Sequence, residues 1–384
     1  MAKSTGARVP GARVPGARIG LAGLATAALL ALSLAACSNT PSSSGSSAAS
    51  SAGPGGASSG TSGSRPVNVG YTIHPAGSKL SIAFIDLGES NTYGAKMASV
   101  ASAWAAANDV NLTVFDANFS ADTELDLIQD AISSGKYNAI ATLPLDPNLL
   151  CNILSKKAPA ANIMVSLLNT PICGAITKVG DVDAGWTPGT LNVSYPGALG
   201  SGVLALAQKC ATLAPGPQKV AMITGPPTAG STIDALEAFR SIPTFTITQD
   251  LITPDFSDAA GVSLTQTALE SHPDTTIVFT VGGPLSVGVA SVLRSEGLSG
   301  KVKICGLSGG TTQDIAALKA GEITVEEIGD PQVFVTASLL SLKDAWDGMA
   351  SPRVITLSPA GQVAPYTTPE ILTPSTASEM KNPY

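Results

Sequence analysis

Apolar and polar positions follow two repeating patterns along the chain from about residue 79. Short runs of branched apolar side chains predict strands, and Ala-rich stretches with apolar residues three or four positions apart predict helices. The predicted strands are 80–87, 112–115, 139–143, 163–167, 220–224, 245–248, 276–281 and 302–306. The predicted helices are 91–108, 123–134, 198–213, 233–240, 259–271, 285–296, 313–320 and 333–346. This alternation indicates an α/β fold with parallel sheets that helices cover on both faces.

The loops that follow the predicted strands are where we expect the functional site. In open parallel sheets, ligands bind beyond the carboxyl ends of the strands. The loops at that edge are 88–93, 144–147, 168–171, 225–232, 282–285 and 307–312.

The N-terminal 36 residues contain four basic residues and no acidic one, and they end in an uncharged apolar run over 19–36. This pattern is typical of a secretion signal. The run ends in Leu-Ala-Ala-Cys37, which resembles the bacterial lipobox, where the cysteine is acylated and becomes the mature N-terminus. Several acyl chains would anchor the protein stably. A buried thiol in an uncleaved membrane helix is the alternative for Cys37.

Residues 38–64 are nearly all Ser, Gly, Ala, Thr and Pro, which are too poor in large apolar groups to bury a core. We interpret them as a flexible tether with a reach of roughly 30 Å. The whole chain has a net charge of −7, and loss of the four basic residues of the signal would make it −11. This charge argues against nucleic acid as a partner. The remaining residues, about 300, suffice for two lobes with separate cores.

Four cysteines besides Cys37 lie in the predicted folded region: Cys151, Cys173, Cys210 and Cys305. None belongs to a Cys-x-x-Cys pair. An even number in an exported protein suggests two disulfide bonds, and a zinc site is the weaker alternative. The sequence by itself allows three pairings.

The segment Gly-Leu-Ser308-Gly-Gly fits the Gly-x-Ser-x-Gly nucleophile elbow of α/β hydrolases. A serine hydrolase needs a histidine base, which in that fold follows the serine along the chain. Both histidines, His74 and His272, precede Ser308. His272 lies at a predicted helix end, where a solvated capping role is the simpler interpretation. Hydrolysis by Ser308 is therefore a remote alternative, and we expect no catalysed reaction.

A second near-match is the loop 225–232, which follows a strand and precedes a helix as a phosphate-binding P-loop would. Ser231 occupies the place of the required lysine, and two prolines remove amides from the phosphate cradle. We interpret the loop as a turn between a strand and a helix. Asp181 and Asp183 form only a weak acidic cluster, so we expect neither a metal nor a cofactor.

Four stretches carry a resemblance to a known family: LSIAFIDLGESNTYGAKMASVASAWA, NLTVFDANFSADTELDLIQDAISSGKYNAIATLPLDPN, KVAMITGPPTAGSTIDALEAF and SGKVKICGLSGGTTQDIAALKAGEITVEEIGDP. In their order and spacing over residues 79–361, the chain resembles periplasmic sugar-binding proteins of the ribose-binding type, the solute receptors of ABC importers. No single motif is specific, but the order of all four is.

The resemblance implies two similar lobes of the periplasmic-binding-protein type I fold, each a parallel sheet flanked by helices. Three crossovers would join them as a hinge that closes over a ligand. We expect these crossovers near 180–183, 329–331 and 353–359. Lobe one would comprise 79–182 and 331–351, lobe two 183–329 and 353–365, and 366–384 would be a C-terminal tail. Because bridges should not cross a moving hinge, this division implies the disulfides Cys151–Cys173 and Cys210–Cys305.

The resemblance also implies where the ligand binds. Asn91 matches a sugar-binding asparagine, Tyr93 matches an aromatic residue that stacks on the sugar, and Phe256 resembles the aromatic residue of the facing lobe. The full set of expected ligand-binding residues is Asn91, Tyr93, Asn169, Phe256, Gly282, Ser308 and Gln332.

The chain departs from the family pattern where the family has a charged clamp for hydroxyl pairs. Leu168-Asn169 replaces Asp-Arg, Gly282-Gly283 replaces Asn-Asp, Ile233 replaces Arg, Leu307-Ser308 replaces Phe-Asp, and Gly329 replaces Gln. Since buried polar groups give strong selectivity for hydroxyls, ribose is not the expected ligand. The glycines should enlarge the cleft, so we predict a ligand larger or less polyhydroxylated than a monosaccharide.

Together these observations predict a lipid-anchored solute-binding protein on the outer face of the cell membrane. It would capture a small molecule, sugar-like by resemblance, and pass it to the permease subunits of an ABC importer. We expect a monomer. A surface receptor or scaffold that reports ligand occupancy to a sensor protein is the alternative from another class, and loss of ligand binding is a further one.

Overall fold

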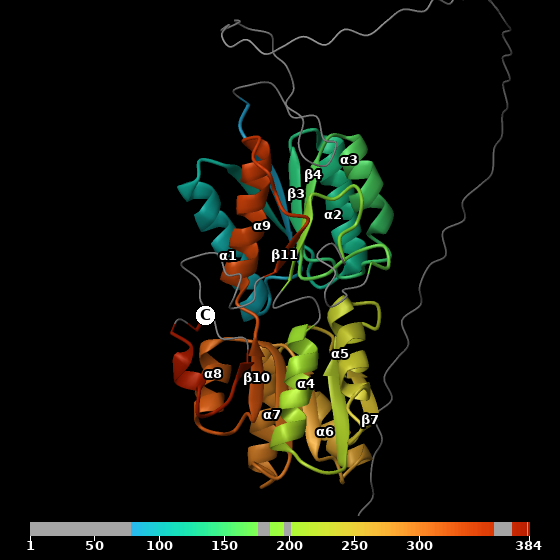
Figure 1. Cartoon of the computed structure of the whole chain (residues 1–384), viewed down its shortest axis with the longest axis vertical. Helices are drawn as coiled ribbons and strands as arrows, with labels where there is room; N and C mark the ends of the chain where they lie inside the picture. Colours follow the sequence, from blue (N-terminus) through green and yellow to red (C-terminus); the bar gives the residue numbers. More distant parts are fainter. Residues whose placement is uncertain (1–77, 176–184, 196–200, 357–370, 382) are drawn as a thin grey trace, which may run out of the picture. The chain divides into compact units, whose positions relative to one another are not determined.

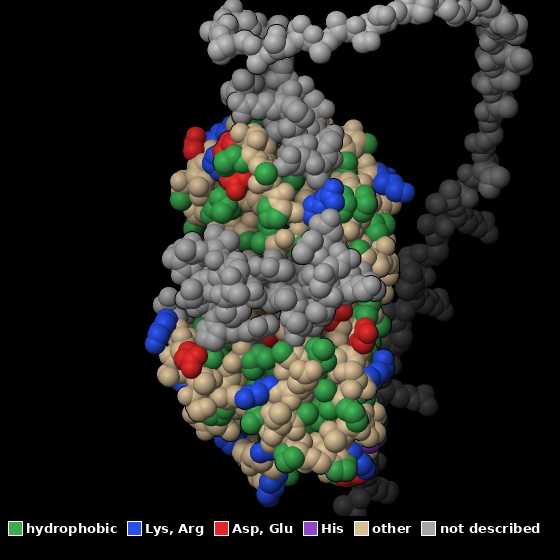
Figure 2. Space-filling view, viewed as in Figure 1, with side chains coloured by type: hydrophobic (Ala, Val, Ile, Leu, Met, Phe, Trp, Pro, Cys, Tyr) green, Lys and Arg blue, Asp and Glu red, His purple; other side chains and the backbone are tan. Residues whose placement is uncertain are grey.

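The computed structural model describes residues 78–175, 185–195, 201–356, 371–381 and 383–384 (Figure 1). The predicted signal, Cys37, the tether and His74 lie outside these residues. In the described part of the chain, no helix is both long enough and apolar enough to span a membrane. Acidic and basic side chains are interspersed over the face shown in Figure 2.

The first sheet has six strands in the order β11-β5-β4-β3-β1-β2, and every neighbouring pair is parallel. Its strands are β1 (Ser81–Asp86), β2 (Asn111–Asp116), β3 (Ala139–Thr142), β4 (Met164–Leu168), β5 (Asn192–Tyr195) and β11 (Val354–Thr356). The helices around it are α1 (Thr92–Ala107), α2 (Ala121–Ser134), a π-helical turn (Ile153–Lys157), α3 (Ala158–Ala160) and α9 (Pro331–Trp346). We call this sheet and its helices the first lobe.

Both faces of the first sheet are buried, as a parallel sheet requires. Along β1, Ile82 and Phe84 pack into the core beneath α1 and α9, whereas Ala83 and Ile85 pack into the core beneath α2. This alternation places α1 and α9 on one face and α2 on the other (Figure 1).

The second sheet also has six strands, in the order β12-β10-β9-β8-β6-β7, and β12 alone is antiparallel to its neighbour. Its strands are β6 (Gln218–Thr224), β7 (Phe245–Ile252), β8 (Ile277–Val281), β9 (Lys303–Gly309), β10 (Val325–Ile328) and β12 (Ile371–Leu372). Its helices are α4 (Ser201–Leu213), α5 (Gly230–Arg240), α6 (Asp258–Ser271), α7 (Gly283–Ser295), α8 (Thr312–Lys319) and a short 3₁₀ helix (Ala377–Glu379). This sheet and its helices form the second lobe.

The chain changes sheets at three places, and two of the predicted boundaries need correction. β5 pairs with β4 in the first sheet, so the described residues 185–195 belong to the first lobe, and the first crossover follows Tyr195 instead of lying near 180–183. The second crossover joins β10 to α9 at 329–330, as predicted. β11 pairs with β5, so Val354–Thr356 belong to the first lobe and not to the second.

The described residues of the predicted C-terminal tail, 371–381 and 383–384, are not a separate tail, because β12 and the 3₁₀ helix belong to the second lobe. β12 pairs with β10 through Glu326 and Leu372, which covers an otherwise open sheet edge. Leu372, Ala377 and Met380 are buried in the core of this lobe. The tail prediction was wrong because these few apolar residues are widely spaced among polar ones.

Both implied disulfide bonds are present. Cys151 is bonded to Cys173, with a Cα–Cα distance of 4.8 Å, and Cys210 to Cys305, with a Cα–Cα distance of 6.2 Å. The first bridge joins the helical turn at Cys151 to the turn at Cys173, both in the first lobe. The second ties α4 to β9 in the second lobe, so each bridge stays within one lobe.

Candidate ligand-binding site

A pocket lies where loops from the two lobes meet, beyond the carboxyl ends of the strands, and it encloses about 770 Å³ of space that is partly open to solvent. Loops after six strands contribute to it, and the lining residues are Leu87, Asn91, Tyr93, Leu143, Pro144, Leu145, Asn169, Thr170, Pro226, Ala229, Ser231, Phe256, Val281, Gly282, Gly283, Pro284 and Ser308. This is the edge of the sheets where an α/β fold of this kind binds its ligand.

Six of the seven predicted ligand-binding residues line this pocket. Asn91, Tyr93 and Asn169 come from the first lobe, and Phe256, Gly282 and Ser308 come from the second. Gln332 is not among the lining residues; it lies in the first turn of α9, where its backbone N–H donates to Asp330 Oδ1 at 2.9 Å. That the six residues bind a ligand remains a prediction.

Four of the lining residues have a backbone conformation that is uncommon in proteins. Asn169, Phe256 and Ser308 have φ values of 57°, 56° and 58°, and Gly282 has 117°. Left-handed conformations of residues other than glycine cost free energy and tend to cluster at functional sites. Three separate loops and the end of β9 thus each bear such a residue at this one pocket.

Each of these four residues is held by a hydrogen bond from its own backbone N–H. The N–H of Asn169 donates to Ser194 O at 2.6 Å, and that of Gly282 donates to Leu307 O at 2.6 Å. The N–H of Phe256 donates to Thr253 Oγ1 at 3.2 Å, and that of Ser308 donates to Glu327 Oε2 at 3.0 Å. These bonds hold the loops in the conformations that form the pocket wall.

Tyr93 is placed by the first turn of α1. Asn91 is the N-cap, and its Oδ1 accepts a hydrogen bond from the N–H of Gly94 at 2.9 Å. A Cβ atom on Gly94 would come within 1.9 Å of Gly88 O, so only glycine allows this turn to lie so close to the loop after β1. The ring of Tyr93 also contacts the ring of Tyr384 edge-on, with 6.3 Å between their centroids.

An aromatic contact joins the two lobes beside the pocket. Phe119, in the loop after β2, lies with its ring centroid 5.6 Å from that of Phe256. The backbone N–H of Phe119 donates to Leu87 O at 2.7 Å. This bond holds Phe119 beside Leu87, which lines the pocket. Phe119 was not among the expected site residues, because its partner lies far away in the sequence and no local pattern marks the pair.

The pocket is uncharged and largely apolar. Among its described lining residues none is charged, and the polar side chains are Asn91, Tyr93, Asn169, Thr170, Ser231 and Ser308. An apolar pocket with a few hydrogen-bonding groups suits a neutral ligand that has an apolar part.

Asp86, at the end of β1, has a buried carboxyl group near the site. It was not predicted as a site residue, because it stands at the end of an apolar strand. Burial raises its pKa to about 8; the hydrogen bond from the N–H of Leu87 opposes this, while Glu89 and Asp116 add to it. Its Oδ2 is buried without a hydrogen-bond partner among the described residues. Burial, together with Glu327, Asp330 and Asp86, likewise raises the pKa of Tyr93.

The raised pKa of Asp86 predicts that the protein is more stable in mild acid than in mild base. The pKa is 3.8 for the ordinary group and about 8 in the folded protein, so between these values the folded state keeps a proton that the unfolded chain has lost. The free energy of unfolding therefore falls as the pH rises through this window. Glu124, with a pKa of about 7, and Asp314, with a pKa of about 6, act in the same direction.

Urea unfolding at pH 5 and pH 8.5 measures this effect. Asp86→Asn cannot ionise, so its stability should change less between the two pH values than that of the wild type. Asp122→Asn removes an exposed carboxyl on α2 and serves as the control. Equal pH dependence in Asp86→Asn and the wild type would contradict the assignment.

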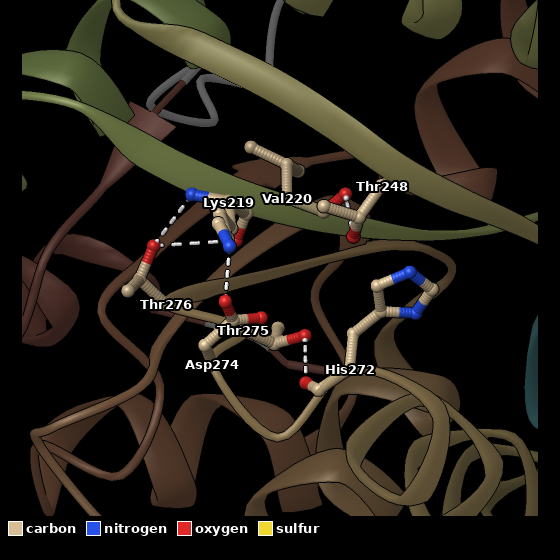
Figure 3. Close-up of polar contacts among 7 residues, drawn as sticks. All are labelled: Lys219, Val220, Thr248, His272, Asp274, Thr275 and Thr276. Atoms are coloured by element: carbon tan, nitrogen blue, oxygen red, sulfur yellow. Dashed lines mark hydrogen bonds and ion pairs between the residues drawn. The ribbon is translucent and has the colours of Figure 1, made fainter.

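The structure separates Ser308 from His272. His272 is the C-cap of α6, in the loop that leads to the start of β8, where the ion pair of Lys219 with Asp274 also lies (Figure 3). Ser308 lies at the other end of this sheet, and the length of β8 alone is roughly 13 Å at about 3.3 Å per residue. The described part of the chain therefore offers Ser308 no histidine base.

The predicted capping by His272 is present, but the imidazole is not fully solvated. The cap is its backbone N–H, which donates to Ala268 O at 2.9 Å. The side chain is half-buried, and Nδ1 is buried without a hydrogen-bond partner among the described residues.

Of the two other motifs, one lies within the described residues. Residues 225–229 join β6 to α5 as a simple turn, and Ser231, in the first turn of α5, lines the pocket. Asp181 and Asp183 lie outside the described residues. Within the described ranges, no group of three or more His, Cys, Asp or Glu side chains could hold a metal ion.

Comparison with known families assigns the chain to one of them. Residues 82–349 match the periplasmic binding protein domain, and the chain belongs to this family. No curated protein matches the chain.

Solved structures of the same fold include three with bound small molecules. The Caulobacter myo-inositol binding protein, bound to myo-inositol, is 19% identical, with a TM-score of 0.66 over 79% of this chain and 97% of that chain. An ABC transporter solute binding protein from Mycobacterium smegmatis, with bound glycerol, is 20% identical, with a TM-score of 0.66 over 80% and 99%. The binding protein of the arabinose ABC transporter from Shewanella sp. ANA-3, bound to L-arabinofuranose, is 17% identical, with a TM-score of 0.64 over 78% and 93%. These likenesses confirm the two-lobe periplasmic-binding-protein type I fold.

Proposed function

We propose that the protein is an extracytoplasmic solute-binding protein that captures a neutral, sugar-like or polyol-like molecule in this pocket. It would deliver the molecule to the permease of an ABC importer. The observation that carries the proposal is the uncharged pocket at the carboxyl ends of both sheets, where Tyr93 and Phe256 lie on different lobes.

The family and the structures of similar fold support this proposal. The chain belongs to the periplasmic binding protein domain family. The three proteins compared above bind myo-inositol, glycerol and arabinofuranose, which are neutral and hydroxylated molecules. A pocket without charged lining residues suits molecules of that kind better than amino acids or phosphate esters.

Ligand capture would use groups from both lobes. The rings of Tyr93 and Phe256 offer apolar faces to the C–H groups of a ring-shaped ligand. The Oδ1 of Asn91 accepts from Gly94, which leaves its NH₂ group to donate to a ligand hydroxyl. The hydroxyl of Ser308 is a second group suited to this. A ligand that contacts both lobes favours their closed arrangement.

Export and anchoring complete the proposal. The basic and apolar N-terminal segment would direct secretion, and acylated Cys37 would hold the mature protein on the outer face of the membrane. The tether 38–64 would let the lobes reach a permease in the same membrane.

The test is a thermal-shift screen of the full mature chain against sugars, polyols, nucleosides and amino acids. A ligand at about one hundred times its dissociation constant stabilises a protein by about 2.7 kcal/mol, so a true ligand should raise the melting temperature clearly. Mass spectrometry of molecules released from gently purified protein provides an independent identification. A screen in which only amino acids or nucleosides gave shifts, or in which nothing did, would refute the proposal.

A further inference from the structure

A second pocket adjoins the first, and the two share Asn91 and Pro284. The second pocket encloses about 550 Å³ of space that is partly open to solvent. The starts of four helices form it: α1 and α6 contribute Thr92 and Asp258, and α7 and α8 contribute Val287 and Gln313. It therefore extends the cleft from the first pocket along the helix starts of both lobes.

The two pockets differ in chemistry. Most side chains in the first are apolar and none is charged, whereas the second has only Pro284 and Val287 as apolar lining residues. Its polar lining includes hydroxyl, amide and carboxylate groups. The cleft thus combines an apolar compartment with a polar one, and Asn91 belongs to both.

Several polar groups of the second pocket keep hydrogen-bonding capacity for a ligand. Asn91 Oδ1, Ser257 Oγ and Thr311 Oγ1 accept hydrogen bonds from the backbone of their own helices, at 2.9 Å, 3.1 Å and 3.2 Å. The NH₂ group of Asn91 and the hydroxyl hydrogen of Ser257 are then left to donate, whereas the hydroxyl of Thr311 is hydrogen-bonded to the carboxylate of Asp314. The carboxylate of Asp258 adds acceptors, and the amide of Gln313 adds both kinds of group.

This mixture of hydrogen-bond donors and acceptors suits the hydroxyl groups of a ligand, because a hydroxyl group both donates and accepts. A phosphate or carboxylate ligand is disfavoured, because the carboxylate of Asp258 would repel it. Asp258 is the only charged residue that lines either pocket in the described structure, so the cleft as a whole suits a neutral ligand.

We propose that the ligand occupies both pockets and is a neutral glycoside. Its apolar aglycone occupies the first pocket, and its sugar occupies the second. This inference rests on the function proposed above and specifies its ligand class.

Isothermal titration calorimetry with matched probes tests this inference on the full mature chain. The probes are the phenyl glycosides of glucose, galactose, mannose and arabinose, each compared with its free sugar. At least one phenyl glycoside should bind ten times or more tightly than its free sugar. If free sugars bind as tightly as their phenyl glycosides, the inference is wrong while the proposed function stands. If neither sugars nor glycosides bind, the inference is wrong, and the thermal-shift screen described above decides the proposed function separately.

Variants of the second pocket locate the sugar. Asp258→Asn and Gln313→Ala should each weaken the binding of that phenyl glycoside by about tenfold. Glu270→Gln removes an exposed carboxyl at the other end of α6 and serves as the matched control, with unchanged affinity. Binding by both variants at the wild-type affinity would show that the sugar does not occupy the second pocket and would overturn the inference.

Discussion

Replacing both Cys210 and Cys305 with alanine is expected to lower the free energy of unfolding by about 4 to 5 kcal/mol. Their disulfide closes a separation of 95 residues, and a bridge over so long a loop removes much conformational freedom from the unfolded chain. Both side chains are fully buried between α4 and β9, so the loss also leaves a defect in the core of the second lobe. Urea unfolding of the oxidised proteins measures the difference.

The other bridge supplies the matched control. Cys151 and Cys173 are separated by 22 residues, for which the same argument gives about 3 kcal/mol. The double alanine variant at Cys151 and Cys173 should therefore lose less stability than the one at Cys210 and Cys305. The opposite order would mean that loop length does not determine what each bridge contributes.

Phe256→Ala is expected to weaken ligand binding by roughly 30-fold to 150-fold, which corresponds to about 2 to 3 kcal/mol for truncating a central aromatic contact. The ring lines the pocket and touches Phe119 of the first lobe, so its removal takes away a contact with the ligand and one between the lobes. Calorimetry with the ligand that gives the largest shift in the screen measures the loss.

Phe115→Ala is the control for this prediction. Phe115 is a half-buried residue of β2 that packs in the first lobe and does not line the pocket, so its loss should reduce stability and leave affinity unchanged. If Phe256→Ala bound the ligand as well as the wild type, the pocket described here would not be the binding site.

Hydrophobic pattern predicted the fold because most strands are continuous apolar runs. β10 and β5 were not predicted, because polar residues occupy buried positions in these two strands and interrupt the apolar pattern. In β10, Glu326 is buried against Gly306 and Gly309, where the absence of side chains makes room for it. In β5, Asn192 accepts a hydrogen bond from Ser166 at 2.6 Å, so a polar network replaces the expected apolar contacts. Tertiary partners of this kind leave no local signal.

The candidate site could be predicted in part from the order of strands and helices. Loops at the carboxyl ends of strands can be found from the order of elements, and six of the seven expected residues line the pocket there. Gln332 is not among the lining residues; it lies in the first turn of α9, after the N-cap Asp330. Phe119 and the second pocket depend on contacts between lobes, and residues far apart in the sequence make those contacts.

Each disulfide bond begins and ends within one lobe, so neither adds a covalent link across the cleft. Reduction of a bridge would therefore destabilise only the lobe that contains it. It would not change how the two lobes move relative to each other. The redox state of the surroundings then affects the stability of the protein, while its affinity for the ligand depends on the noncovalent contacts of the cleft.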